Sequence, residues 1–337
     1  MLPSLHIQGF RCFRELTIER LGRVNLIVGK NNVGKTTLLD ALRLHAAQED
    51  ALYALEEMLE RRSEILRSTK STSPSERVVD WLRAFFHDPQ VNEIQIGPCG
   101  EVEETLRLIK ERQLGRVGAV TAKIGTISID EFALLGEALE PRPVSEDVIP
   151  CQYIPSTGLS AEESSRLWDS VVLTEYEETC LQALRIIEPD IQRLALVDVP
   201  AAGGGVERSP HVMRVSRPQP EPLSSLGEGM SRIFYIMLGM TNSRGGRLLI
   251  DEIENGLHHS ILETLWRHIL DVASKLDVQV FATTHSWGCI EAFQAAARDH
   301  GEEGMLIRLD RREEETRAFL FDEEDLAVVA RQGIEVR

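Results

Sequence analysis

The sequence has few cysteines, and none of them form a pair at metal-binding or redox spacing. The five are Cys12, Cys99, Cys151, Cys180 and Cys289. Zinc sites and disulfide frameworks are recognised in a sequence by closely spaced cysteine pairs such as C-x-x-C. The wide separation argues against both, and we expect reduced, buried thiols.

Long apolar runs are also missing. No stretch approaches the roughly 18 apolar residues that a membrane-spanning helix needs. Residues 1–10 lack a basic segment followed by an apolar one, so they do not resemble a secretory signal. Hydrophobic residues make up 42% and charged residues 27%, an ordinary globular composition. We therefore expect a cytoplasmic protein that makes no membrane contact.

Positive charge is scarce. The chain has 37 Lys and Arg against 54 Asp and Glu, a formal net charge of −17. Nucleic-acid binding needs clustered cations, so this balance argues against a protein coated in nucleic acid, although it leaves room for a local basic groove. Arg61, Arg62, Arg67, Lys70 and Arg77 do gather in one stretch, for which a solvated helix face is the ordinary explanation.

The first 45 residues show strand, glycine loop and helix in succession. Residues 5–7 and 16–18 alternate like short strands, and 23–28 is an apolar strand. The loop 29–34 is bounded by glycines, and 35–44 begins a helix. Strand, loop and helix together form half of a β-α-β unit.

The remaining chain alternates between helical and strand patterns. Residues 48–88 and 162–187 have helical spacing, and 91–96 and 117–129 alternate in the β manner. Two short apolar runs are typical of strands covered on both faces of a parallel sheet, residues 248–250 and 278–282.

These patterns predict one α/β domain over residues 1–337. We expect a mixed or parallel central sheet, interrupted by a long insertion at 48–190 that contributes a helical lobe and an antiparallel β subdomain. The last part, 305–337, is expected to be an acidic C-terminal segment, because acidic residues concentrate at 313–315 and 322–325. Solubility or a basic partner protein would explain such a segment.

Residues 29–37 read GKNNVGKTT and fit the phosphate-loop pattern G-x-x-x-x-G-K-[ST]. In such a loop, backbone N–H groups cradle phosphate at a helix N-terminus. Lys35 would reach the β- and γ-phosphates, and the Thr36 hydroxyl would bind Mg²⁺. A glycine turn that merely joins strand to helix would not explain the Lys-Thr pair. The candidate nucleotide-binding residues are Gly29, Asn31, Asn32, Gly34, Lys35, Thr36 and Thr37.

An apolar strand at 247–250 ends in two carboxylates, Asp251 and Glu252. A strand beside the phosphate-loop strand would bring Asp251 to the Mg²⁺ shell near Thr36. Glu252 would then lie where a water must be deprotonated for attack on the γ-phosphate. Taken alone, an acidic pair that only caps the next helix explains these residues equally well.

The next strand favours the catalytic interpretation, because it ends at His285. A histidine that leaves a strand beside a phosphate loop can bond the γ-phosphate and hold the attacking water. The adjacent His258 and His259 differ from it. On a helix they would point about 100° apart, which makes them poor joint metal ligands.

Residues 223–232 read LSSLGEGMSR and precede an apolar, helix-like run. The order of phosphate loop, this signature segment, D-E strand and T-H-S strand resembles that of the ABC ATPase superfamily. Three stretches are most similar to OLD-like (AAA15/AAA21) ATPases, which are related to the SMC, Rad50 and RecF branch. They are GFRCF at 9–13, VNLIVGKNNVGKTT at 24–37 and DEIENGLH at 251–258. The resemblance covers about residues 1–45 and 220–290.

This resemblance implies an ABC-type head that hydrolyses ATP with Mg²⁺, with Lys35, Glu252 and His285 in catalysis. It implies a homodimer in which ATP lies between the phosphate loop of one subunit and the signature segment of its partner. Ser225, Gly227 and Gly229 would then contact the partner's nucleotide. The chain departs from the LSGGQ pattern, since Leu226 stands at the serine position; backbone amides or Ser225 would replace that contact.

The resemblance also suggests two outlying contacts. Arg11 holds the position of the family's F-R motif and would touch nucleotide, although a surface arginine is a comparable explanation. Gln152 is a candidate for the glutamine of the Q-loop.

The family also suggests a biological setting. OLD nucleases carry a Toprim domain after the ATPase, and residues 286–337 are too few for one. The resemblance therefore implies an ATPase that works with a separately encoded effector such as a nuclease, often in antiphage defence, with dimers able to assemble further.

Two alternatives remain open. A RecF-like repair ATPase would bind DNA directly, but ENGLH at 254–258 departs from the S-x-L-D run of that group, and the acidic balance also counts against it. The ATPase subunit of a membrane transporter fits less well, because such subunits lack a long insertion directly after the phosphate-loop helix.

Overall fold

The computed structural model describes residues 1–51, 54–55, 57–58, 85–88, 90–113, 116–125, 127–133, 148–200, 204–298, 300, 303–313 and 315–322. The expected helical stretch 48–88 therefore lies mostly outside the described residues; its first three residues, Gln48–Asp50, form a 3-10 turn.

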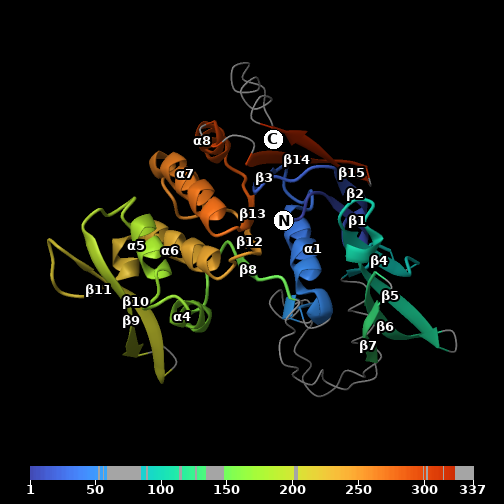
Figure 1. Cartoon of the computed structure of the whole chain (residues 1–337), viewed down its shortest axis with the longest axis horizontal. Coiled ribbons are helices and arrows are strands. Elements are labelled where there is room, and N and C mark those ends of the chain that lie inside the picture. The colour runs from blue at the N-terminus through green and yellow to red at the C-terminus, as the bar shows by residue number, and fades with distance from the viewer. Residues whose placement is uncertain are drawn as a thin grey trace.

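A six-stranded mixed sheet forms the centre of the molecule, in the order β15-β14-β3-β13-β12-β8 (Figure 1). Five strands run parallel and the edge strand β15 runs antiparallel. The predicted mixed or parallel central sheet is thus confirmed. Its strands are β3 (Val24–Val28), β8 (Cys151–Ile154), β12 (Arg247–Ile250), β13 (Gln279–Thr283), β14 (Gly304–Arg312) and β15 (Glu315–Phe321).

The two faces of this sheet belong to two separate hydrophobic cores. Strand β3 sends Val24, Leu26 and Val28 into one core and Ile27 into the other, as the alternation of a strand requires. One core is shared with helices on the carboxyl half of the chain, and the other with α1 (Lys35–Ala47) and an antiparallel sheet. Because both faces are covered, β3, β12 and β13 are buried along their whole length.

An antiparallel sheet packs beside α1, in the order β2-β1-β4-β5-β6-β7 (Figure 1). Its first two strands come from the N-terminus, so the β subdomain is only partly contributed by the expected insertion. The run 117–129 is two strands with a turn at Gly125. The strands are β1 (Leu5–Phe10), β2 (Phe13–Ile18), β4 (Glu93–Gly97), β5 (Leu106–Gln113), β6 (Arg116–Ile124) and β7 (Ile127–Ala133).

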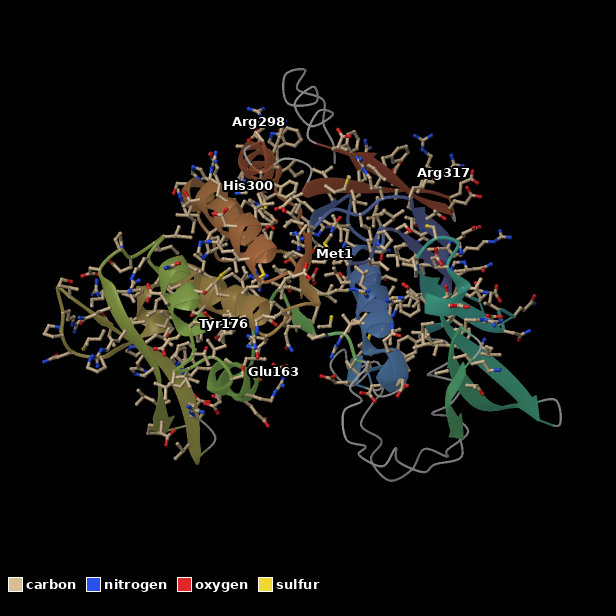
Figure 2. All side chains as sticks on the ribbon, viewed as in Figure 1. Met1, Glu163, Tyr176, Arg298, His300 and Arg317 are labelled. Carbon is tan, nitrogen blue, oxygen red and sulfur yellow. The ribbon has the colours of Figure 1, made fainter. Side chains whose placement is uncertain are left out.

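A helical lobe with a three-stranded sheet lies on the other side of the central sheet (Figure 1). Figure 2 shows Glu163 and Tyr176 in this lobe and Arg317 on the opposite side of the molecule, on β15. The lobe and the helices that follow it comprise α4 (Ala161–Asp169), α5 (Tyr176–Leu184), β9 (Ile191–Pro200), β10 (Val206–Arg214), β11 (Glu221–Pro222), α6 (Glu228–Thr241), α7 (His259–Lys275) and α8 (Trp287–Ala297).

Two expected segments take part in the central sheet. The insertion predicted at 48–190 includes β8, which pairs with β12 inside that sheet. The segment predicted at 305–337 contains β14 and β15, and β14 pairs with β3; its last residues, 323–337, lie outside the described part of the chain. Among the described helices, none combines the length and the apolar character needed to cross a bilayer.

Candidate functional site

The phosphate loop folds around the ammonium group of Lys35. Nζ donates to the carbonyl oxygens of Gly29 at 2.7 Å and Lys30 at 3.1 Å, and the residue is 6% exposed. Gly34 caps α1 with φ 107°, and a Cβ at this position would lie 2.6 Å from the Phe13 ring. A side chain here would therefore be strained by the backbone and blocked by packing.

His285 links this lysine to the acidic strand end. Its Nδ1 lies 3.3 Å from Lys35 Nζ, and its Nε2 lies 3.7 Å from Glu252 Oε1. The main-chain N–H of His285 donates to Glu254 Oε1 at 3.0 Å, which fixes the start of the turn after β13. Lys35, His285 and Glu252 thus form a continuous chain of contacts from the phosphate loop to the end of β12.

Asp251 joins the cluster through β13. Strand β3 lies between β14 and β13, and β12 lies one strand beyond β13, so the predicted adjacency of β12 and β3 is wrong. Thr283, the last residue of β13, bridges the gap. Its hydroxyl donates to Asp251 Oδ1 at 2.7 Å and accepts from the Glu252 N–H at 2.8 Å.

The charges of these groups act on one another. Burial lowers the pKa of Lys35, and the nearby carboxylates of Asp251, Glu252 and Glu254 oppose that shift. A cation with acidic groups around it suits the binding of a polyphosphate with its metal ion, because the cation attracts the phosphate and the carboxylates attract the metal. Thr36, next to Lys35, and Asp251 offer a hydroxyl and a carboxylate, the oxygen donors that Mg²⁺ prefers.

Within the chain, the signature segment is not part of this cluster. Ser225 donates to the carbonyl of Pro222 at 2.7 Å, inside its own turn. Gly227 is exposed, with φ 106°, at the start of α6. Gly229 packs against the turn that follows Glu252: a Cβ there would lie 2.9 Å from the carbonyl oxygen of Gly256. This close approach requires glycine whatever the segment binds.

Arg11 is held by contacts within the chain. Its guanidinium lies 4.9 Å from the Phe85 ring, and Nε is 3.5 Å from Asp40 Oδ2 on α1. The side chain is 11% exposed. The predicted nucleotide contact of Arg11 stays a prediction.

The other predicted residues lie as follows. Asn31 and Asn32 are exposed on the phosphate loop, and Thr37 is in the first turn of α1. Gln152 is inside β8, opposite Leu248.

His258 corrects an expectation. It precedes α7 and caps it by accepting from the Ser260 N–H at 3.3 Å. The rings of His258 and His259 lie 4.1 Å apart, so these two side chains are not directed apart by one helix.

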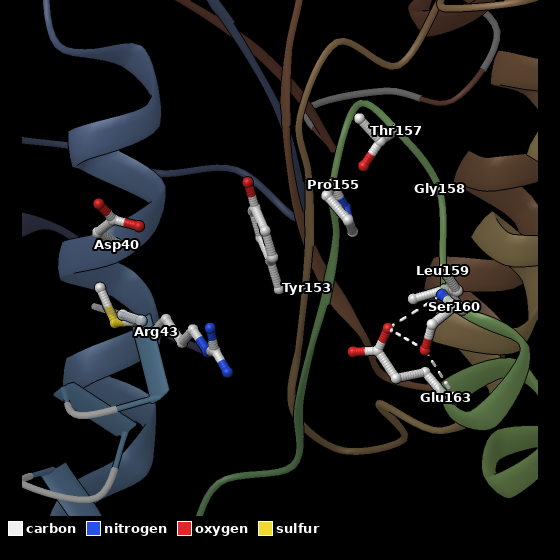
Figure 3. A pocket seen from close by; sticks show the side chains of 10 residues that line it. Asp40, Arg43, Tyr153, Pro155, Thr157, Gly158, Leu159, Ser160 and Glu163 are labelled. Carbon is white, nitrogen blue, oxygen red and sulfur yellow. Dashed lines mark hydrogen bonds between the residues drawn. The ribbon is translucent and has the colours of Figure 1, made fainter. Parts of the chain in front are cut away.

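A cavity of about 510 Å³ lies between α1 and the loop that follows β8 (Figure 3). Arg43 and Tyr153 face it from α1 and β8, and Ser160 with Glu163 forms the far wall. Ser160 and Glu163 bond reciprocally as the capping box of α4. The lining does not include Lys35, Asp251, Glu252 or His285, so this space is separate from the cluster around Lys35.

Sequence reasoning missed two residues of the site. Thr283 stands in the T-T-H-S wording, and its position directly before the polar strand end was the available signal. Arg232 is the other: it donates to the main-chain carbonyls of Asp251 and Glu252. The single charged residue in the otherwise uncharged run 230–240 was the signal in that case.

Two families match parts of the chain. Residues 4–112 match an AAA domain family. Residues 207–290 match a family described as "AAA domain, putative AbiEii toxin, Type IV TA system". The two matches contain the phosphate loop and the Asp251–His285 strand ends, respectively.

Curated relatives are similar over different lengths. An ATP/GTP phosphatase of Helicobacter pylori is 23% identical, and the match covers 89% of each chain. An uncharacterized protein of Methanocaldococcus jannaschii is 44% identical over 50 residues, which is 15% of this chain and 23% of that protein.

Solved structures share the fold over nearly the whole chain. An SMC head bound to the C-terminal winged-helix domain of ScpA has a TM-score of 0.56 and 12% identity, covering 96% of this chain and 98% of that one. An SMC head with an extended coiled coil, bound to the C-terminal domain of Pyrococcus furiosus ScpA, has a TM-score of 0.55 and 9% identity, covering 99% of both. The matched AAA segments and the ATP/GTP phosphatase relative support ATP hydrolysis by this chain, and its fold is that of the SMC heads.

Proposed function

We propose that this protein is an ATP-driven switch, in which two copies clamp ATP and Mg²⁺ and hydrolysis by Glu252 releases the clamp. The observation that carries the proposal is the chain of contacts from Lys35 through His285 to Glu252. Lys35 would bind the β- and γ-phosphates, and His285 would hold the attacking water near the γ-phosphate. Glu252 would accept the proton of that water.

Mg²⁺ is the metal expected at the two oxygen donors next to these contacts, Thr36 and Asp251. The Thr36 hydroxyl and the Asp251 carboxylate would hold it, and Thr283 orients Asp251 through its hydrogen bond. When bound, the metal would neutralise charge on the phosphate oxygens.

Two features of the signature segment support the proposed dimer. Gly227 is exposed, and Ser225 bonds only within its own turn among the contacts described. The Gly227 N–H itself donates to Ser224 O at 3.1 Å, so the backbone N–H groups that a phosphate would meet at the N-terminus of α6 are those of Glu228 and Gly229. We infer that this end of α6 meets the nucleotide of a second copy.

The output of the switch would be a separate effector, with a nuclease as our first candidate, in a cytoplasmic defence system. The resemblance to OLD-like ATPases and the family description of a putative AbiEii toxin support this direction. A nuclease reading frame beside this one, whose product co-purifies with the ATP-bound protein, would support it. Neighbouring replication genes would favour the RecF-like alternative.

Lys35→Ala and Glu252→Gln test the ATPase mechanism on the purified chain. We expect Lys35→Ala to weaken ATP binding more than tenfold. Glu252→Gln should bind ATP, lose about 100-fold or more in kcat and accumulate as a dimer with ATP and Mg²⁺. Phosphate release, nucleotide titration and light scattering measure these quantities.

Exposed residues provide matched controls. Lys275→Ala on α7 and Glu291→Gln on α8 make the same chemical changes outside the site and should behave as the parent protein. Parental turnover in Glu252→Gln would show that another group accepts the proton.

A further inference from the structure

Arg232 joins three segments that meet at the end of the central sheet. One nitrogen of its guanidinium donates to Asp251 O at 2.6 Å and to Glu252 O at 3.0 Å. The other terminal nitrogen donates to Pro155 O at 2.6 Å. The residue is 4% exposed and lies on α6, the helix that begins within the signature segment at Glu228.

Glu252 has a backbone conformation that needs such support. Its φ is 48°, in the left-handed region, which costs a residue with a side chain about 1–2 kcal/mol. The Glu252 N–H is held by the Thr283 hydroxyl, and the Ile253 N–H donates to Thr283 O at 3.0 Å. Arg232 holds the carbonyls of the same two peptide groups from the opposite side. The peptides before and after Glu252 are therefore clamped between β13 and α6.

Pro155 connects these clamped peptides to the cavity between α1 and the loop that follows β8. It follows β8, and together with Thr157 it faces the cavity beside α1 (Figure 3). In the same loop, Ser156 O accepts from the Asn255 side chain at 2.9 Å, three residues beyond Glu252. A movement of α6 would thus reach both the catalytic turn and the loop 155–160 through one side chain.

The guanidinium is suited to this position by its charge and its shape. Burial lowers the pKa of Arg232 to about 10, against the opposing fields of Asp251 and Glu254, so it stays protonated at neutral pH. Its planar fork serves several carbonyls at once, whereas a lysine would act as a point charge. Main-chain carbonyls accept its hydrogen bonds, so the carboxylates of Asp251 and Glu252 stay available.

We propose that Arg232 is a positioning residue for hydrolysis, which sets the direction of the Glu252 carboxylate and couples it to the signature end of α6. This inference rests on the proposed function, in which Glu252 is the base. Arg232 touches neither nucleotide nor water in it; it acts through the backbone of Glu252.

Arg232→Met in the full chain tests this role. We expect kcat to fall at least about tenfold while the dissociation constant of a fluorescent ATP analogue changes by less than about twofold. A kcat within about twofold of the parent overturns the proposal. So does a kcat loss matched by an equal loss of nucleotide affinity, because a positioning role acts on turnover alone.

Arg247→Met is the matched control. Arg247 is 5% exposed and lies at the other end of β12, where it donates to His45. We expect Arg247→Met to lower the melting temperature comparably while keeping kcat per folded molecule. An equal loss of kcat in both variants would show a general packing effect and overturn the proposal. If Arg232→Met does not fold, Arg232→Lys takes its place with the same criteria.

A double variant separates this inference from the proposed function. If Arg232 acts through Glu252, then adding Arg232→Met to Glu252→Gln causes no further loss of kcat, because both changes disable the same catalytic function. A further tenfold loss in the double variant overturns the inference. Parental turnover in Glu252→Gln alone would instead contradict the proposed function, whatever Arg232→Met does.

Discussion

At the residue scale, two buried cations of the site are held by main-chain carbonyls. Lys35 donates to the carbonyls of Gly29 and Lys30, and Arg232 donates to those of Pro155, Asp251 and Glu252. The carbonyls accept from the Lys35 ammonium and from the two terminal nitrogens of Arg232, whereas the buried Arg232 Nε has no hydrogen-bond partner among the described residues. A carbonyl dipole does not cancel a positive charge in the way that the carboxylate of an ion pair does. The positive charge of Lys35 therefore stays available for a polyphosphate.

His45 gives the chain a pH-dependent stability. Its Nδ1 accepts from Arg247 at 2.9 Å, and Nε2 donates to Glu104 O at 3.0 Å. Burial, followed by the charge of Arg247, lowers the pKa of His45 to about 3. Below about pH 6.5 the unfolded chain binds a proton that the folded protein refuses, so stability falls by about 1.4 kcal/mol per pH unit until the folded pKa is reached.

His45→Gln isolates this contribution. We expect the variant to be less stable than the parent at pH 7.5, and the difference in free energy of unfolding to narrow by about 1 kcal/mol at pH 5.5. Urea titrations at the two pH values measure it. Thr241→Val serves as control, since Thr241 is buried and carries no titrating group, so its difference from the parent should not change. A constant difference for His45→Gln would contradict the expectation.

At the element scale, Gly229 and Gly288 make a natural comparison. Each is the second residue of its helix, α6 or α8. Adding a Cβ to Gly288 meets only Ser286 Oγ at 3.7 Å, so Gly288→Ala should stabilise the protein by about 0.4–1 kcal/mol. The same change at Gly229 meets Gly256 O at 2.9 Å and should destabilise it.

Melting temperatures of Gly229→Ala and Gly288→Ala test this contrast. We also expect Gly229→Ala to lower kcat, because α6 would shift against the turn at Gly256 and carry Arg232 with it. Gly288→Ala should turn over at the parental rate. Equal melting temperatures for the two variants would contradict the prediction, because they would show that α6 and the turn at Gly256 can move apart without a loss of stability.

At the scale of the whole molecule, charge bears on direct DNA binding. With a net charge of −17, we expect the purified protein to leave duplex DNA unshifted at about 150 mM salt, with or without ATP, because phosphate contacts weaken steeply as salt rises. A gel-shift titration with Glu252→Gln and ATP measures this. An ATP-dependent, salt-sensitive shift would favour the RecF-like alternative.

The order of elements around the phosphate loop could be predicted from the sequence because local signals determine it. Apolar runs mark β3, β12 and β13, and the glycines and the Lys-Thr pair mark the loop and the start of α1. Those signals act within a few residues of one another. The same signals indicate the candidate residues. Lys35 belongs to the phosphate-loop pattern, Asp251 and Glu252 follow β12, and His285 follows β13.

Only the tertiary structure decided which strand lies beside β3 and what holds Glu252. Strand order depends on packing between segments far apart in the chain, so β13 could separate β12 from β3 without a local sign. The contacts of Arg232 and Thr283 with the turn at Glu252 arise in the same way. The sequence by itself determined which groups can do the chemistry, because reactivity is a property of residue type. The fold decided their distances and their supports, because these come from long-range packing.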